Sequence, residues 1–267
     1  MTAPVQVPPR PPRSRFAIAL GVAVLAFSVF AAAKVGFSLG AFGDVFTRPN
    51  PVARGLKNIR WGEMFSQRSR NAFLETLYLA VLGTLGGILL ALPLSLWSTR
   101  IGNPYRIPRM ILRAFNNVIR AFPDLLWAGL FVLGVGIGAL PGFLALTFFS
   151  CAVMSKLTAD TLDGIDLGPV EAANAAGAGH TQMLRTAIVP QILPAFSSFA
   201  LYSFELNLRA SVVLGFVGAG GIGQRLNFFR ERGRLEAYEQ MWGLVVMFFL
   251  VVFVVERLSV AIRRRLV

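Results

Sequence analysis

The stretch from Asp166 to Pro190, DLGPVEAANAAGAGHTQMLRTAIVP, is a polar and small-residue island between two long apolar segments. Pro169 suits the first turn of a helix, because its missing N–H would have no partner there. Glu171 falls in the same turn, where the helix dipole favours a carboxylate. The alanines that follow favour a helix with almost no side-chain bulk, and Gly177 and Gly179 can end it. The stretch therefore predicts a short, smooth helix.

A second short helix is expected after these glycines. Thr181 could cap it, and its apolar residues lead into the next membrane segment: Met183, Leu184, Ala187 and Ile188. On spacing alone, two interpretations of the whole stretch stay open. It could dock into a groove of another protein, or it could be an ordinary alanine-rich loop helix.

The composition indicates a membrane protein. Of the 267 residues, 55% are hydrophobic and 15% are charged, and the mean hydropathy is +0.63. So apolar a chain is unlike a soluble domain. The single Cys151 excludes an internal disulfide, and the single His180 excludes a histidine-rich metal site, so no metal is expected. Many arginines behind the net charge of +13 flank apolar segments, which fits membrane anchoring and anion attraction better than nucleic-acid binding.

The apolar segments predict an all-α membrane protein with six transmembrane helices. About 20 apolar residues cross the roughly 30 Å hydrocarbon core as a helix. The expected spans are 16–36, 72–97, 121–139, 142–160, 188–210 and 241–260. The expected regions are a disordered N-terminus at 1–15, the first span and its connector at 16–71, a core of five spans with the 166–190 loop at 72–262, and a basic tail at 263–267.

The first span has a rival interpretation. The alanines at 31–33 could be the cleavage site of a secretory signal peptide. The apolar run at 16–36 is long for a signal core and further spans follow, which favours a retained helix. In the connector, residues 54–70 could form an interfacial helix that carries Trp61 and Phe65.

Small residues mark places where the backbone can be approached closely. A face of small residues on the second span would allow tight helix packing. It consists of Gly83, Thr84, Gly86 and Gly87. A tight turn at Pro141 and Gly142 is expected before the fourth span. Residues 211–223 are apolar and glycine-rich, which predicts irregular backbone shielded by protein rather than facing lipid.

Polar and charged side chains in or beside the spans are candidate pathway residues, because charge is costly at membrane depth. They are Glu75, Arg120, Asp124, Glu205, Asn207 and Arg209. Glu205 and Arg209 are four residues apart and can pair on one helix face. Lys156 and Asp160 have the same spacing, with Asp163 one turn on. Such pairs could instead neutralise each other and hold helices in register, which is the favoured interpretation for Lys156 and Asp160.

The sequence GAGGIG at 218–223 fits G-x-G-x-x-G, and Glu239 stands near the expected acidic position. A dinucleotide site needs a preceding strand in a βαβ unit, whereas a membrane span precedes this segment. Gly218, Gly220 and Gly221 would instead permit the tight backbone that a gate requires. The chain has no G-x-x-x-x-G-K-[ST] sequence, so it is not expected to bind ATP or act as an enzyme. ATP-driven work would need a separate subunit.

The 166–190 stretch resembles the EAA loop of binding-protein-dependent ABC transporter permeases. That pattern is Glu-Ala-Ala, three residues, Gly, nine residues, Ile, one residue and Leu-Pro. This chain departs from it only at Ala187 and Val189, which stay apolar. The resemblance implies a coupling helix that sits in a cleft of a cytoplasmic ATPase. Its coupling residues would be Glu171, Ala172, Ala173, Gly177 and Gly179.

Further motifs narrow the resemblance to the phosphonate-type (PhnE) permease family over about residues 70–260. They are Glu75-Thr76, RAFPD at 120–124, KLTADTLD at 156–163, FELNLR at 204–209 and VLGFVGAGGIG at 213–223. The resemblance implies the MetI-like ABC importer fold, a homodimer of this chain, two ATP-binding subunits and an extracytoplasmic binding protein. It also implies import of phosphonate or a related oxyanion such as phosphate or phosphite. ATP and Mg would be bound by the partner ATPase, and no cofactor by this chain.

Six spans place both termini on one side of the membrane. That side carries 14 Lys and Arg residues and the other side 12, so the positive-inside rule favours cytoplasmic termini only slightly. The resemblance, which places the 166–190 loop in the cytoplasm of a bacterial cell with the protein in the inner membrane, decides the orientation. The basic outer face could concentrate an anionic substrate, or its arginines could hold lipid phosphates.

A stand-alone secondary transporter or channel for an anion is the alternative function. An intramembrane enzyme lacks support, because the single His and single Cys have no evident catalytic partner. The oxyanion carried, and any substrate site in the permease itself, stay open at this point.

Overall fold

A computed structural model describes residues 15–37, 40, 43 and 51–266 of the chain, and its regular elements there are all helical. The chain divides into two compact units, Met1–Ala53 and Arg54–Val267. In the first unit, α1 (Arg15–Val35) is an apolar helix of 21 residues, long enough to cross a membrane. It matches the predicted first span. Of the segment 1–15 that was predicted to be disordered, residues 1–14 lie outside the described residues, and Arg15 is the first residue of α1.

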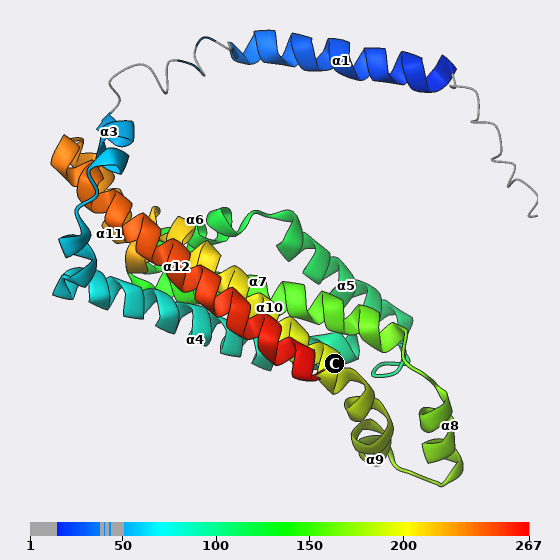
Figure 1. The fold of residues 1–267 in the computed structure, drawn as a ribbon. Helices are drawn as coiled ribbons and strands as arrows, with labels where there is room; N and C mark the ends of the chain where they lie inside the picture. The colour runs from blue at the N-terminus through cyan, green and yellow to red at the C-terminus, as the bar shows by residue number, and fades with distance from the viewer. Residues whose placement is uncertain (1–14, 38–39, 41–42, 44–50, 267) are drawn as a thin grey trace, which may run out of the picture. The chain divides into compact units, whose positions relative to one another are not determined.

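The second unit is a bundle of long helices (Figure 1). Its principal helices are α4 (Gln67–Trp97), α5 (Arg106–Ala121), α6 (Asp124–Val135), α7 (Ala139–Asp163), α10 (Val189–Gly215) and α12 (Leu235–Leu266). Its short elements are α3 (Pro51–Lys57, which begins at the end of the first unit), η1 (Trp61–Phe65), α8 (Gly168–Ala175), α9 (His180–Met183), the π-helical turn η2 (Leu184–Ile188) and α11 (Gly221–Arg232). The elements α8 and α9 lie at one end of the bundle, and α11 lies at the other.

The centre of the bundle is the contact of α4 with α7, on which α10 packs from the side. The small-residue face predicted on α4 is the face that meets α7. A Cβ placed on Gly83 would lie 2.6 Å from Cβ of Leu146, and one on Gly87 would lie 2.3 Å from Cβ of Ser150. The helices can therefore approach each other only because these positions lack side chains.

Five helices among the described residues are long and apolar enough to cross a membrane, and a sixth span results if α5 and α6 are counted as one bent helix. These two helices meet at an angle of 91°. The predicted third span at 121–139 is thus only partly helical, since α6 has 12 residues and covers about 18 Å. The segment before it forms the amphipathic helix α5.

Three local predictions are wrong in detail. Pro141 and Gly142 lie inside the first turns of α7, and the chain reverses at Gly136–Gly138 instead. Thr181 does not cap the second helix of the 166–190 stretch, because Gly179 occupies the cap position. Residues 54–70 do not form one interfacial helix but are divided among α3, η1 and the start of α4, whose cap is Ser66.

Candidate functional site

The short helix predicted in the 166–190 stretch is present as α8, which begins at Gly168 with Pro169 in its first turn. Its buried side is Val170, which packs with the apolar residues Leu162, Met183, Ala187, Ile188 and Ile192. Glu171 and Ala172 are exposed, and Ala173 is half-buried. The helix therefore presents a small-residue face with one carboxylate away from the bundle.

The loop that carries α8 is tied to the start of α10. The side-chain amide of Gln191 accepts a hydrogen bond from the Asp166 N–H (3.1 Å) and donates to the Asp166 carbonyl (3.2 Å) and the Ala187 carbonyl (2.7 Å). Past α8, Gly177 has a φ of +76°, a backbone conformation that residues with a side chain rarely adopt. A displacement of α8 would thus be transmitted to α10 through the clamp between Asp166 and Gln191.

The glycine segment lies at the opposite end of the second unit, between α10 and α11. The Thr76 hydroxyl of α4 accepts a hydrogen bond from the Ile222 N–H (2.8 Å). A Cβ on Gly220 would lie 2.5 Å from Oε1 of Glu75, and one on Gly221 would lie 2.6 Å from Oγ1 of Thr76. The segment is therefore tightly packed backbone. The irregular backbone predicted for 211–223 is limited to residues 216–220, because α10 continues to Gly215 and α11 begins at Gly221.

The same segment also contacts the start of α7. The Gly138 N–H donates to the Gly218 carbonyl (2.9 Å), and a Cβ on Gly142 would lie 2.6 Å from the Ala219 carbonyl oxygen. Glu75, Gly218, Gly220 and Gly221 are thus brought together in one cluster, which we call the glycine turn.

An ion pair joins α11 to the segment before α4. Nη2 of Arg225 lies 2.6 Å from Oε1 of Glu63. Burial raises the pKa of Glu63, but hydrogen bonds from Arg225, Ser66 and Ser69 and the charge of Arg225 outweigh it, so the pKa is lowered overall. Glu63 is therefore ionised at neutral pH and fixes the position of α11 beside the glycine turn.

Asn207 lies at the centre of the bundle and is fully buried. Its side-chain amide nitrogen donates to the hydroxyls of Thr84 on α4 (2.9 Å) and Ser150 on α7 (2.7 Å). Asn207 thus links three long helices. Its position indicates a role in helix packing.

Glu205 is buried, and its closest partner is Arg263 near the end of α12, at 2.6 Å between Nη2 and Oε1. The predicted pair with Arg209 is looser, at 4.0 Å, and Arg209 is exposed. The sequence missed Arg263 because residues 263–267 were predicted to be a separate basic tail, whereas α12 continues to Leu266. The predicted pair of Lys156 and Asp160 is present at 2.6 Å.

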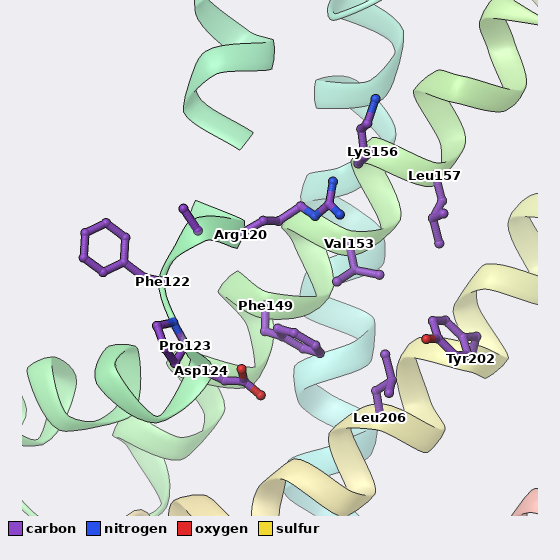
Figure 2. Close-up of a pocket in the computed structure, with 11 residues that line it drawn as sticks. Arg120, Phe122, Pro123, Asp124, Phe149, Val153, Lys156, Leu157, Tyr202 and Leu206 are labelled. Carbon is purple, nitrogen blue, oxygen red and sulfur yellow. The ribbon is translucent and has the colours of Figure 1, made fainter. Parts of the chain in front are cut away.

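Arg120 and Asp124 line a cavity of about 570 Å³ between the junction of α5 with α6 and the middle of α7 and α10. Figure 2 shows the Arg120 side chain extending from the junction toward α7, with Asp124 below it and Tyr202 opposite on α10. The apolar part of the wall includes Phe149, Val153 and Leu206. We call this space the junction cavity. The sequence analysis missed Tyr202, whose only signal is a polar group within an apolar span.

The predicted pathway residues therefore occupy three separate places in this chain. Glu75 and the glycines lie in the glycine turn, Arg120 and Asp124 in the junction cavity, and Glu205 and Asn207 in helix contacts. Among the described residues, no group of three or more His, Cys, Asp and Glu side chains could hold a metal ion.

Comparisons with known proteins agree with this architecture. The model of the family described as "Binding-protein-dependent transport system inner membrane component" matches residues 87–267. The inward-facing structure of the MetNI methionine ABC transporter superimposes with a TM-score of 0.66 at 22% identity, over 76% of this chain and 100% of that chain. That likeness confirms the predicted MetI-like helical fold.

Two relatives are similar in sequence. The "Phosphate-import permease protein PhnE" of Mycolicibacterium smegmatis is 41% identical over 190 residues, which are 71% of this chain and 35% of that protein. The "Phosphite transport system permease protein PtxC" of Stutzerimonas stutzeri is 35% identical over 193 residues, which are 72% of this chain and 68% of that protein. The chain thus spans about a third of the length of the first relative. The predicted resemblance to phosphonate-type permeases is confirmed.

Proposed function

Because this chain belongs to the family of binding-protein-dependent transport system inner membrane components, we propose that it is the membrane-spanning subunit of an ATP-driven importer of phosphonate, phosphate or phosphite. The names of the two relatives supply phosphate and phosphite, and the resemblance to phosphonate-type permeases supplies phosphonate. ATP would be hydrolysed in a separate subunit, so this chain is not itself an enzyme.

The observation that carries this proposal is the exposed face of α8. A helix of small residues with a single carboxylate, held at one end of a membrane bundle, suits a groove in a soluble partner. The clamp between Asp166 and Gln191 joins α8 to α10, which reaches the glycine turn at its far end. Closure of an ATPase dimer would move α8, tilt α10, and change the packing at the glycine turn.

The proposed assembly contains two copies of this chain, two ATP-binding subunits and a substrate-binding protein. α8 and both termini would face the cytoplasm, and the glycine turn would face outward. The arginines near that turn would then concentrate an anionic substrate at the entrance. Arg230 and Arg232 lie there on α11, with their guanidinium carbons 5.4 Å from the Phe216 ring and 4.2 Å from the Phe228 ring.

The test is ATP-dependent uptake by the complete complex in proteoliposomes. Glu171→Arg reverses the charge of the docking face, and Gly177→Val strains a backbone with φ +76°. Both substitutions are expected to abolish uptake. The ATPase subunit would then either remain bound and hydrolyse ATP without transport, or dissociate from the complex. Ala176→Ser, at an exposed position outside the α8 face, is the control. Uptake at the wild-type rate in Glu171→Arg would contradict the docking role, and uptake without any ATPase would favour a stand-alone anion transporter.

A further inference from the structure

The junction cavity has polar groups that the proposed coupling mechanism does not use. Among the described residues, neither the Arg120 guanidinium nor the Asp124 carboxylate has an ion-pair or hydrogen-bond partner, and the same holds for the Tyr202 hydroxyl. All three line one space of about 570 Å³. A cavity of this size is large enough for a small oxyanion with part of its water shell.

The position of the cavity makes these unpaired polar groups energetically costly. Phe149 and Val153 lie near the middle of α7, and Tyr202 lies near the middle of α10. Both helices are long enough to cross a membrane, so we infer that the cavity lies within the membrane-spanning part of the bundle. Charged groups at such depth normally pair with each other or face a pathway. Arg120 and Asp124 are not paired, so they are available to a ligand.

The break between α5 and α6 explains how the two charges come to share the cavity. Arg120 is in the last turn of α5, and Asp124 is the first residue of α6, with Phe122 and Pro123 between the two helices. The axes of the two helices differ by 91°, so both side chains project from the corner toward α7. Without this break, Arg120 and Asp124 would stand four residues apart on one helix and could neutralise each other.

The polar groups of the cavity wall favour one class of ligand, an oxyanion that carries a proton. Arg120 offers a planar fork of N–H donors that matches two oxygens of an oxyanion. Tyr202 can add a neutral donor from the opposite wall. Lys156 lies at the rim, where Asp160 already accepts one of its hydrogen bonds at 2.6 Å. The Asp124 carboxylate can only accept, so it favours a ligand that carries its own proton.

We propose that the junction cavity is a binding site of the permease itself for a protonated phosphorus oxyanion, such as hydrogen phosphate, hydrogen phosphite or a phosphonate. Arg120 and Tyr202 donate to its oxygens, and Asp124 accepts from its P–OH group. Sulfate has the same shape and no proton at neutral pH, so its oxygens would meet the Asp124 carboxylate unfavourably. This inference deepens the proposed function and rests on it for the direction of transport.

The test is equilibrium binding of radiolabelled inorganic phosphate to the full chain in nanodiscs of phosphatidylcholine, without the binding protein or ATPase. Arg120→Gln is expected to weaken phosphate binding by at least about tenfold, since it removes hydrogen bonds between charged groups. Arg120→Lys keeps the charge and should retain part of the affinity. Arg106→Gln, on the same helix and outside the cavity, is the matched control and should bind as the wild type does.

A second arm tests the role of the proton. Asp124→Asn, which offers a donor in place of an acceptor-only group, should narrow the preference for phosphate over sulfate by about tenfold. Equal phosphate binding by wild type and Arg120→Gln, or none by either, would overturn the proposal. The same measurement in nanodiscs that also contain phosphatidylglycerol tests a lipid source of the anion. If phosphate does not bind there and Arg120→Gln instead reduces the retention of phosphatidylglycerol, the bound group is a lipid headgroup and the proposal also falls.

Failure of this site and failure of the importer can be told apart. If the Arg120→Gln complex takes up substrate at the wild-type rate, the proposed importer function stands and the proposed binding site is wrong. If phosphate binding depends on Arg120 but the complex shows no ATP-dependent uptake, the proposed binding site stands and the proposed importer function is wrong.

Discussion

Arg263 in the last turns of α12 reaches the Glu205 carboxylate on α10, with 2.6 Å between Nη2 and Oε1. The Glu205 side chain is only 7% exposed, so this pair closes the bundle across 58 residues of sequence. The contact fixes α12 against the helix that continues into the glycine turn.

Loss of Arg263 should destabilise the protein. Arg263→Gln leaves the Glu205 charge buried, which costs up to about 3–5 kcal/mol, reduced here because Arg209 lies 4.0 Å from the other oxygen. The midpoint of thermal unfolding in detergent is expected to fall, and the double variant Glu205→Gln/Arg263→Gln should recover much of the loss. Arg264→Gln, at an exposed neighbouring position, is the control. An unchanged unfolding midpoint for Arg263→Gln would show that the ion pair contributes nothing to the stability of the folded protein.

The close approach of α4 and α7 predicts a difference between two glycine substitutions. Gly87→Ala places a Cβ 2.3 Å from Cβ of Ser150, and this overpacking should cost about 1–3 kcal/mol. Gly129→Ala makes the same change in α6, where no atom lies within 4 Å, and should be neutral or stabilising by up to about 1 kcal/mol. Unfolding midpoints measured side by side check this, and equal midpoints would contradict the packing.

The pair of Glu63 and Arg225 predicts a pH dependence at α11. The pKa of Glu63 is lowered below its ordinary value of 4.5 in the folded protein, so the pair stabilises α11 at neutral pH. The stabilisation begins to fall as the pH drops below 4.5 and is lost as it passes through the folded pKa. The protection of the α11 amides against hydrogen exchange, taken relative to the intrinsic exchange rate at each pH, should fall over that range in the wild type. In Glu63→Gln the protection should already be low at pH 7 and should change less with acid.

Most of the spans, the short helix α8 and the glycine-rich turn could be predicted from the sequence because each depends on local features. Hydrophobic length predicts α4, α7 and α12, and Pro169 and Gly177 set the limits of α8. The small residues of α4 also predicted its contact face. These features act within a few residues of one another, so one stretch of sequence contains the whole signal.

The remaining features depend on residues that only the fold brings together. The approach of Arg263 to Glu205 requires the register of α12 against α10, which no spacing in the sequence encodes. The 91° break at Phe122–Pro123 falls at the start of the span predicted at 121–139, and hydropathy alone did not indicate it. Tyr202 becomes a site candidate only because that break places Arg120 opposite it across the junction cavity.

The proposed transport mechanism depends most on the contact of α8 with an ATP-hydrolysing subunit. Site-directed cross-linking tests this contact directly. The only cysteine, Cys151, is buried and can be replaced by serine to give a clean background. Ala172→Cys on the exposed face of α8 should then cross-link to cysteines around the groove of the ATPase in the assembled complex, with a yield that changes on ATP binding. Thr99→Cys, at a buried position, should give no product. Absence of any ATPase product from Ala172→Cys in an active complex would contradict the account.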